Sequence, residues 1–178
     1  MLKLLSLATL ALCVSHLAAA QTNDAAFSSA LRSYVALHNS AADGLPRETG
    51  DPAAAASAER MLAGRIQDQR KNPRAGEILG PASDGIRRAV AEELAGPRGQ
   101  AIRSSIEQDN VHGVRLRVNH RYPPGLPRVT MPGSILAKLP ALPSELEYRF
   151  LGRSLALVDT QAGLVVDVLP DVLPPPGR

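Results

Sequence analysis

The clearest structural signal in the chain lies in Pro140–Pro170, PALPSELEYRFLGRSLALVDTQAGLVVDVLP. Three short runs with strand character lie here between turn-forming residues, namely Glu145–Phe150, Ser154–Asp159 and Leu164–Leu169. Apolar and charged side chains alternate in the first run, which is the period of a strand with one buried face. The second run is apolar on both faces, as in a central strand. The stretch therefore predicts an antiparallel meander of three strands.

Glycines and a proline set the ends of these strands. Gly152 and Gly163 stand in the two connections, where a tight turn needs the positive φ that glycine adopts without strain. Pro170 ends the third run because it has no N–H group to donate to a sheet. We therefore expect Gly163 to tolerate valine poorly and the meander to be the centre of stability.

The same residues carry a resemblance. The pattern LPxLPxxLEYRFxGRxLxLxDxxAxLVVDxLP resembles the ending of a family of small secreted proteobacterial proteins whose function is uncharacterised, and the segments Arg117–Pro123 and Met131–Pro140 are similar to further parts of that family. The order of strands and turns is also remotely similar to the end of RcnB-type periplasmic nickel/cobalt-homeostasis proteins. The resemblance implies a secreted or periplasmic protein, and it brings no catalytic residue to this chain.

Upstream of residue 110 the pattern is helical. Four amphipathic segments are predicted, at about 23–38, 52–71, 81–94 and 97–108, with Asn23 or Asp24 capping the first and Asp51-Pro52 opening the second. The side chains expected to face inward are Phe27, Leu31, Tyr34, Val35, Ala58, Met61, Leu62, Ile66, Ile86, Val90, Leu94, Ala101, Ile102 and Ile106.

Between these helices and the meander, Val114, Leu116 and Val118 alternate with polar residues and predict a fourth strand. Residues 122–132 read as an extended connector, and Ser134–Leu139 as at most two helical turns. The expected fold class is α+β: about four N-terminal helices (residues 21–110), then a small antiparallel sheet of three to four strands (residues 111–170) in the same domain. Residues 171–178 are expected to be a disordered tail.

The first 20 residues have the pattern of a secretory signal peptide. Lys3 is the charged start, Leu4–Val14 the apolar region, and Ala18-Ala19-Ala20 the cleavage site before Gln21. The apolar region is too short to span a bilayer. Cys13, the single cysteine, would leave with this segment, so the mature chain would contain no disulfide. We expect a periplasmic or secreted protein without a transmembrane segment after cleavage.

The sequence offers little support for catalysis or metal binding. His38, His112 and His120 are expected at the surface or at strand ends, and His112 and His120 would lie roughly 26 Å apart along one strand, too far to share an ion. None of the serine-hydrolase, nucleotide-binding or zinc motifs is present. We predict no resident cofactor and no nucleic-acid partner, while a hydrolytic triad assembled from distant residues stays open.

Two pairs of carboxylates are candidate sites. Glu145 and Glu147 have the spacing of a glycosidase pair on one strand face, but cross-strand pairing with Arg115 and Arg117 is favoured. Asp159 and Asp167 are interpreted as turn-capping and strand-exit carboxylates rather than metal ligands.

Basic residues gather in the middle of the chain, where residues 61–128 hold twelve basic and seven acidic side chains. A candidate anion-binding patch comprises Arg65, Arg70, Lys71, Arg74, Arg87 and Arg88, and it would attract an anionic envelope surface or an acidic protein. A solvated helix face is the alternative. The sequence thus predicts a non-catalytic envelope protein of unknown binding role, with a periplasmic metal-homeostasis accessory protein and a small secreted hydrolase with a dispersed site as alternatives.

Overall fold

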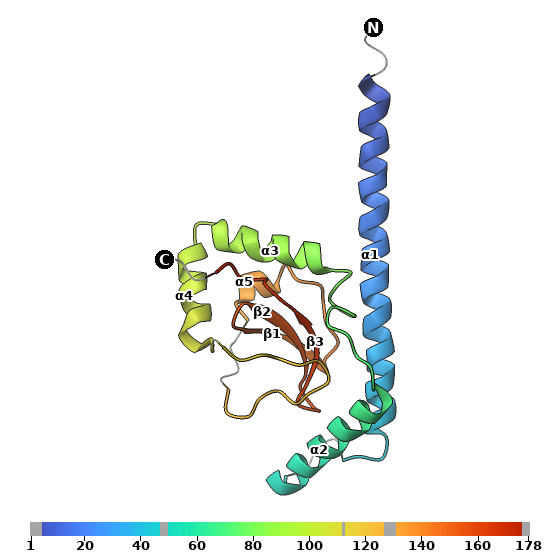
Figure 1. Ribbon diagram of the computed structural model, residues 1–178, viewed down its shortest axis with the longest axis vertical. Helices are drawn as coiled ribbons and strands as arrows, with labels where there is room; N and C mark the ends of the chain where they lie inside the picture. The colour runs from blue at the N-terminus through green and yellow to red at the C-terminus, as the bar shows by residue number, and fades with distance from the viewer. Residues whose placement is uncertain (1–4, 47–49, 112, 127–130, 176–178) are drawn as a thin grey trace.

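The computed structural model of the chain describes residues 5–46, 50–111, 113–126 and 131–175. Five helices and three strands follow one another in the order α1 (Leu5–Ala42), α2 (Pro52–Gln69), α3 (Ser83–Ala95), α4 (Gly99–Asp109), α5 (Gly133–Leu136), β1 (Leu146–Leu151), β2 (Ser154–Asp159) and β3 (Leu164–Leu169). Helices come first and a small antiparallel sheet comes last (Figure 1), so the predicted α+β class is confirmed.

The sheet is the predicted meander, in the order β1-β2-β3. The first hairpin is in register from Leu146 opposite Asp159 to Leu151 opposite Ser154, and the second contains a bulge next to Leu157 and Val158. Gly152 (φ 56°) and Gly163 (φ 59°) both hold the positive φ that their turns were expected to need. The sequence therefore determines both hairpins locally.

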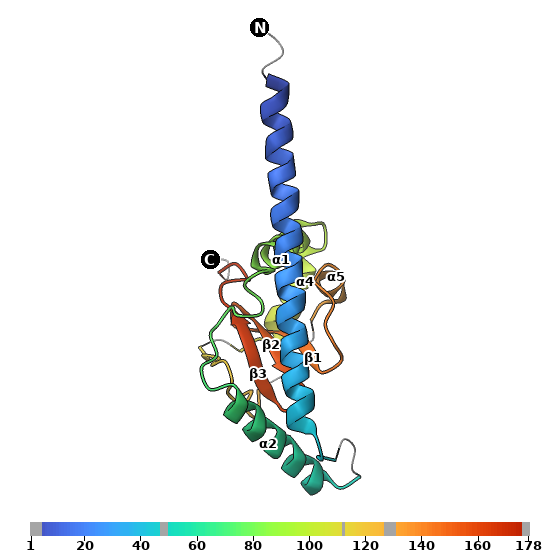
Figure 2. The same cartoon turned by 90° about the vertical axis from the view of Figure 1, so that its right-hand side faces the viewer.

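Helix α1 lies across the sheet, and its N-terminal part extends beyond the rest of the chain (Figures 1 and 2). Between α1, α3 and the sheet lies one core, to which β1 and β2 contribute Phe150, Leu155 and Leu157, all with 0% exposure. Burying side chains of this size contributes about 1.5–3 kcal/mol each. The meander therefore supplies the centre of the core.

The other helices follow the sequence pattern with local corrections. Asp51 caps α2 by accepting a hydrogen bond from the Ala53 N–H at 2.9 Å, and the Ile86, Val90, Leu94 stripe of α3 is buried, both as predicted. The cap predicted at Asn23 or Asp24 is wrong because α1 begins at Leu5 and runs through both residues.

Two side chains expected to face inward are exposed instead. Met61 is 45% exposed on α2, where Ala58, Leu62, Ala63 and Ile66 form the buried stripe. Ala101 is exposed on α4, and only its neighbours Ile102 and Ile106 are buried. Each of these two residues directly precedes a residue of the buried stripe in the sequence. The apolar period of the helix therefore does not tell which of the two neighbours faces inward.

The predicted fourth strand is not formed among the described residues. Val114, Leu116 and Val118 are half-buried and alternate with exposed Arg115 and Arg117, so the alternation is present, but the segment makes no ladder. Asn119 takes a positive φ of 62° and turns the chain, leaving a single bridge between Arg121 and Leu164. The segment runs from the Gly152 turn, which Asn110 holds through two side-chain hydrogen bonds, to the start of β3. The alternation of apolar and polar residues thus correctly predicted a half-buried extended segment, but the predicted pairing of this segment with the meander is wrong.

The short helical region before the meander is confirmed as α5 and a following turn. The connector predicted at 122–132 falls in part outside the described residues, as do the last three residues of the tail. The expected disorder of the tail does not hold at Val172 and Leu173, which are 7% and 6% exposed and donate their N–H groups to the Arg153 carbonyl at 2.8 and 3.1 Å.

Candidate functional site

A cluster of polar side chains joins α1 to the sheet. Tyr34 and His38 are four residues apart on α1 and therefore share one face of the helix. Both reach the carboxylate at the end of β2: the Tyr34 hydroxyl donates to Oδ2 of Asp159 at 2.8 Å, and Nδ1 of His38 lies 2.6 Å from the same oxygen. Residues more than 120 positions apart in sequence thus meet at one oxygen atom.

The second oxygen of Asp159 holds the turn between β2 and β3. Oδ1 accepts hydrogen bonds from the backbone N–H groups of Gln161 at 3.0 Å and Ala162 at 2.8 Å. An aspartate that caps its own turn in this way is the role predicted from the sequence. Asp159 therefore connects the turn of the meander to the long helix.

All three side chains of the cluster are buried, with exposures of 4% for Tyr34, 2% for His38 and 0% for Asp159. The hydrogen bond to Asp159 raises the pKa of His38; burial opposes this, and the charges of Asp159 and Glu145 add to it. Burial and the Asp159 carboxylate raise the pKa of Tyr34, so this tyrosine stays a neutral donor. The prediction that His38 lies at the surface is wrong.

The pair has the geometry in which a carboxylate orients a histidine that acts as a general base. A general base must also come within hydrogen-bond reach of a substrate proton. With 2% of His38 exposed, the imidazole is enclosed by protein. The arrangement can hold a proton between α1 and the sheet, and it fixes both parts in place.

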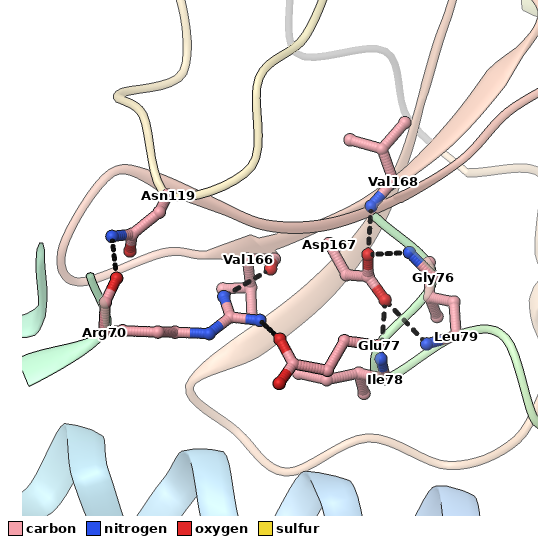
Figure 3. A network of polar contacts seen from close by, with 9 residues as sticks. All are labelled: Arg70, Gly76, Glu77, Ile78, Leu79, Asn119, Val166, Asp167 and Val168. Carbon is pink, nitrogen blue, oxygen red and sulfur yellow. Dashed lines mark hydrogen bonds and ion pairs between the residues drawn. The ribbon is translucent and has the colours of Figure 1, made fainter. Parts of the chain in front are cut away.

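A second buried carboxylate ties the sheet to the segment before α3 (Figure 3). Asp167 is 0% exposed and accepts backbone N–H groups from Gly76 at 2.6 Å, Ile78 at 2.8 Å and Leu79 at 2.7 Å. Successive backbone N–H groups that converge on an anion form a nest of this kind. Asp167 was expected to be a strand-exit carboxylate, and the sequence contained no signal for its partners.

Arg70 extends this network toward α1. Its guanidinium donates to the Val166 carbonyl at 2.6 Å and to Glu77 at 2.7 Å, and it lies 5.9 Å from the centre of the Tyr34 ring. Asn119 donates to the Arg70 carbonyl at 2.8 Å (Figure 3). Arg70 was predicted as part of a surface patch, but its side chain is 12% exposed and binds within the fold.

The remaining cations of the candidate patch divide into two kinds. Arg65 donates to the carbonyls of Ala41 and Asp43 at 3.0 and 2.7 Å, and Arg87 donates to the Pro170 carbonyl at 2.7 Å. Exposed side chains are found at Lys71, Arg74 and Arg88. Half of the predicted patch, namely Arg65, Arg70 and Arg87, therefore donates hydrogen bonds to backbone carbonyls within the fold.

The other candidate residues do not come together. Glu147 forms an ion pair with Arg149 on its own strand, so the expected pairing with Arg115 and Arg117 is wrong; both of those arginines are exposed. His120 is exposed and His112 lies outside the described residues.

The described residues lack both a metal-binding cluster and a membrane-spanning helix. They contain no group of three or more His, Cys, Asp or Glu side chains that could hold a metal ion. No helix in the same part of the chain combines the length and apolar character that a membrane span requires.

Comparisons of the chain with protein-family models, with curated proteins and with solved structures found no match.

Proposed function

We propose that this chain is a non-catalytic protein of the cell envelope, exported by its first 20 residues, which acts by binding a partner. The observation that carries the proposal is the burial of the His38–Asp159 pair, with exposures of 2% and 0%. These two side chains are well suited to proton transfer, yet they lie where they connect α1 to the sheet. Asp167 and Arg70 are likewise engaged within the fold.

A small hydrolase is the second candidate, and one observation favours it. Nδ1 of His38 lies 2.6 Å from a carboxylate oxygen of Asp159, which is how hydrolases hold a catalytic histidine. For this candidate to apply, α1 would have to move away from the sheet and expose the imidazole. The tight packing of Phe27, Leu31 and Tyr34 in the same core opposes such a movement.

Export is tested by producing the chain with residues 1–20 in a Gram-negative host and separating periplasm from cytoplasm. Mass spectrometry of the periplasmic protein should find a chain beginning at Gln21. A variant with Ala18 and Ala20 both replaced by Phe should keep its first residues, because the cleavage site needs small side chains. Recovery of the native chain in the cytoplasm starting at Met1 would contradict the proposal.

Catalysis is tested separately with the purified mature protein and p-nitrophenyl acetate, butyrate and phosphate as substrates. We expect no turnover above the rate of the His38→Gln variant. The matched control is His120→Gln, which changes an exposed histidine. Hydrolysis that His120→Gln retains and that His38→Gln abolishes, while circular dichroism shows the His38→Gln protein to be folded, would establish the hydrolase in place of the binding protein.

A further inference from the structure

Residues 114–117 form an extended stretch of backbone that belongs to no sheet. Their burial alternates with the period of two of a strand, since Val114 and Leu116 are half-buried while Arg115 and Arg117 are exposed. The stretch lies between α4 and the bridge that Arg121 makes with Leu164. It therefore has the form of a strand without the neighbour that a strand pairs with.

The backbone groups of this stretch are unpaired within the described part of the chain. The one hydrogen bond they make belongs to the turn that follows, where the Arg117 carbonyl accepts the His120 N–H group at 3.2 Å. Every non-proline residue carries one donor and one acceptor that need a partner, and water supplies it here because none of the four residues is buried. A row of N–H and C=O groups in contact with water is what an unpaired strand edge offers to another chain.

Positive charge accompanies the unpaired backbone. From residue 110 to residue 144 the sequence contains five basic side chains and no aspartate or glutamate. Two of the five, Arg121 and Lys138, pair with glutamates from elsewhere in the chain. Arg115 and Arg117 form no ion pair with the described residues, and two residues of extended chain place them about 7 Å apart on one side. These two guanidinium groups are thus open to an anionic partner.

The unpaired backbone and the two charges together indicate the kind of partner. A phosphate-bearing surface would engage both arginines but would leave the backbone groups of the stretch to water. A second copy of the stretch would pair with the backbone but would bring arginine close to arginine, and like charges opposite one another destabilise a strand pair. An acidic peptide strand meets both requirements, because its backbone completes the hydrogen bonds and its carboxylates lie beside the guanidinium groups.

We propose that residues 114–117 bind an acidic peptide in extended conformation, which pairs with them as an added strand. The carboxylates of the peptide lie on the side of Arg115 and Arg117, and small apolar residues alternate with them on the side of Val114 and Leu116. In this mode main-chain hydrogen bonds give affinity and the alternate side chains give selectivity. The inference rests on the proposed binding function and names its partner class.

The test is fluorescence anisotropy at low salt with a fluorescein-labelled octapeptide of alternating glutamate and valine, titrated with the mature protein. The double variant Arg115→Ser/Arg117→Ser should bind the peptide at least about fivefold more weakly, because two cross-strand charge pairs are lost. The matched control is Arg32→Ser/Arg88→Ser, which removes the same charge from exposed residues of α1 and α3. We expect the affinity of this control to stay within about twofold of the native value. Equal melting temperatures of the two variants establish that both are folded.

Hydrogen exchange resolved to single amides shows whether the backbone of the stretch pairs with the peptide. In the free protein the amides of residues 114–117 should exchange as fast as in an unstructured chain, because they have no acceptor within the fold. A saturating concentration of the octapeptide should slow alternate amides of the stretch about tenfold or more, since alternate residues of a strand direct their N–H groups to the same edge.

A competitor separates strand addition from attraction to any anionic surface. Vesicles containing phosphatidylglycerol, added at an equal concentration of exposed negative charge, should leave the labelled peptide bound. The proposal is overturned by complete displacement with these vesicles, by unchanged hydrogen exchange in the bound state, by equal affinity of the two double variants, or by no binding of the octapeptide. Lack of peptide binding in a protein that is exported and does not hydrolyse esters removes this inference alone, whereas hydrolysis that depends on His38 removes the proposed function.

Discussion

Replacing Asp167 by asparagine removes the charge that holds the segment 76–79 against β3. The carboxylate accepts N–H groups on both oxygens, from Gly76 on one side and from Ile78 and Leu79 on the other. An asparagine keeps one oxygen but places an NH₂ group where the second stood. In either orientation two backbone N–H groups then face another donor inside the protein, either those of Gly76 and Val168 or those of Ile78 and Leu79.

The size of the loss follows from these contacts. Hydrogen bonds to charged groups contribute about 1.5–3 kcal/mol each, and a buried donor left unsatisfied costs about 1–3 kcal/mol. One lost charged bond and one unsatisfied donor alone therefore predict a loss of about 2.5–6 kcal/mol in the free energy of unfolding. Small domains have a total of about 5–15 kcal/mol.

Urea denaturation of the mature protein, followed by far-ultraviolet circular dichroism, measures this free energy. Asp68→Asn is the matched control, because Asp68 is exposed on α2; its loss should stay within about 0.5 kcal/mol. A loss below about 1 kcal/mol for Asp167→Asn, or one equal to that of the control, would refute the role assigned to this carboxylate.

Three further predictions concern the meander and its junction with α1. Gly163→Ala and Gly152→Ala should each lower the melting temperature, because both glycines hold a positive φ that alanine adopts only with strain; unchanged melting temperatures in both variants would contradict this. Phe150→Ala should cost about 3–5 kcal/mol in urea denaturation, since the ring is completely buried, and a loss under about 1 kcal/mol would remove the meander from the centre of stability. The raised pKa of His38 predicts a pH dependence: its stabilisation is complete below the unfolded pKa of about 6.5 and is lost as pH rises through the higher folded pKa. As pH rises through this range, the melting temperature should therefore fall in the native protein and in His120→Gln, but not in His38→Gln. The same dependence of melting temperature on pH in all three proteins would contradict the role assigned to His38.

The hairpins were predictable because their signals are local. Alternation in β1, the glycines of both turns and Pro170 each act on neighbouring residues, and the structure has both turns where these residues place them. The cap of α2 is local in the same sense. Strand pairing outside hairpins is not local, and this explains the error at Val114–Val118: alternation shows that one side of the segment is half-buried, but not which partner covers it.

The polar cluster could be predicted only in part. The turn-capping role of Asp159 follows from its position before Thr160–Gly163, whereas its contacts with α1 depend on how the helix lies against the sheet. One signal was present in the sequence: Tyr34 and His38 fall on the apolar face of α1 that also carries Phe27 and Leu31, and a histidine in that position is expected to be buried. Nothing comparable marks Asp167, whose partners are backbone groups of a loop.

The role proposed for His38 and Asp159 is to hold α1 against the sheet and not to act in catalysis, and a double-mutant cycle distinguishes these roles. Free energies of unfolding at pH 6 are measured for the native protein, His38→Gln, Asp159→Asn and the double variant. Each single change should destabilise the protein by about 2 kcal/mol or more, and the coupling free energy between the two residues should exceed about 1 kcal/mol. Residues kept for catalysis are often not optimised for stability, and replacing them frequently leaves the protein as stable or makes it more so. Unchanged or raised stability of His38→Gln, with a coupling near zero, would contradict the claim.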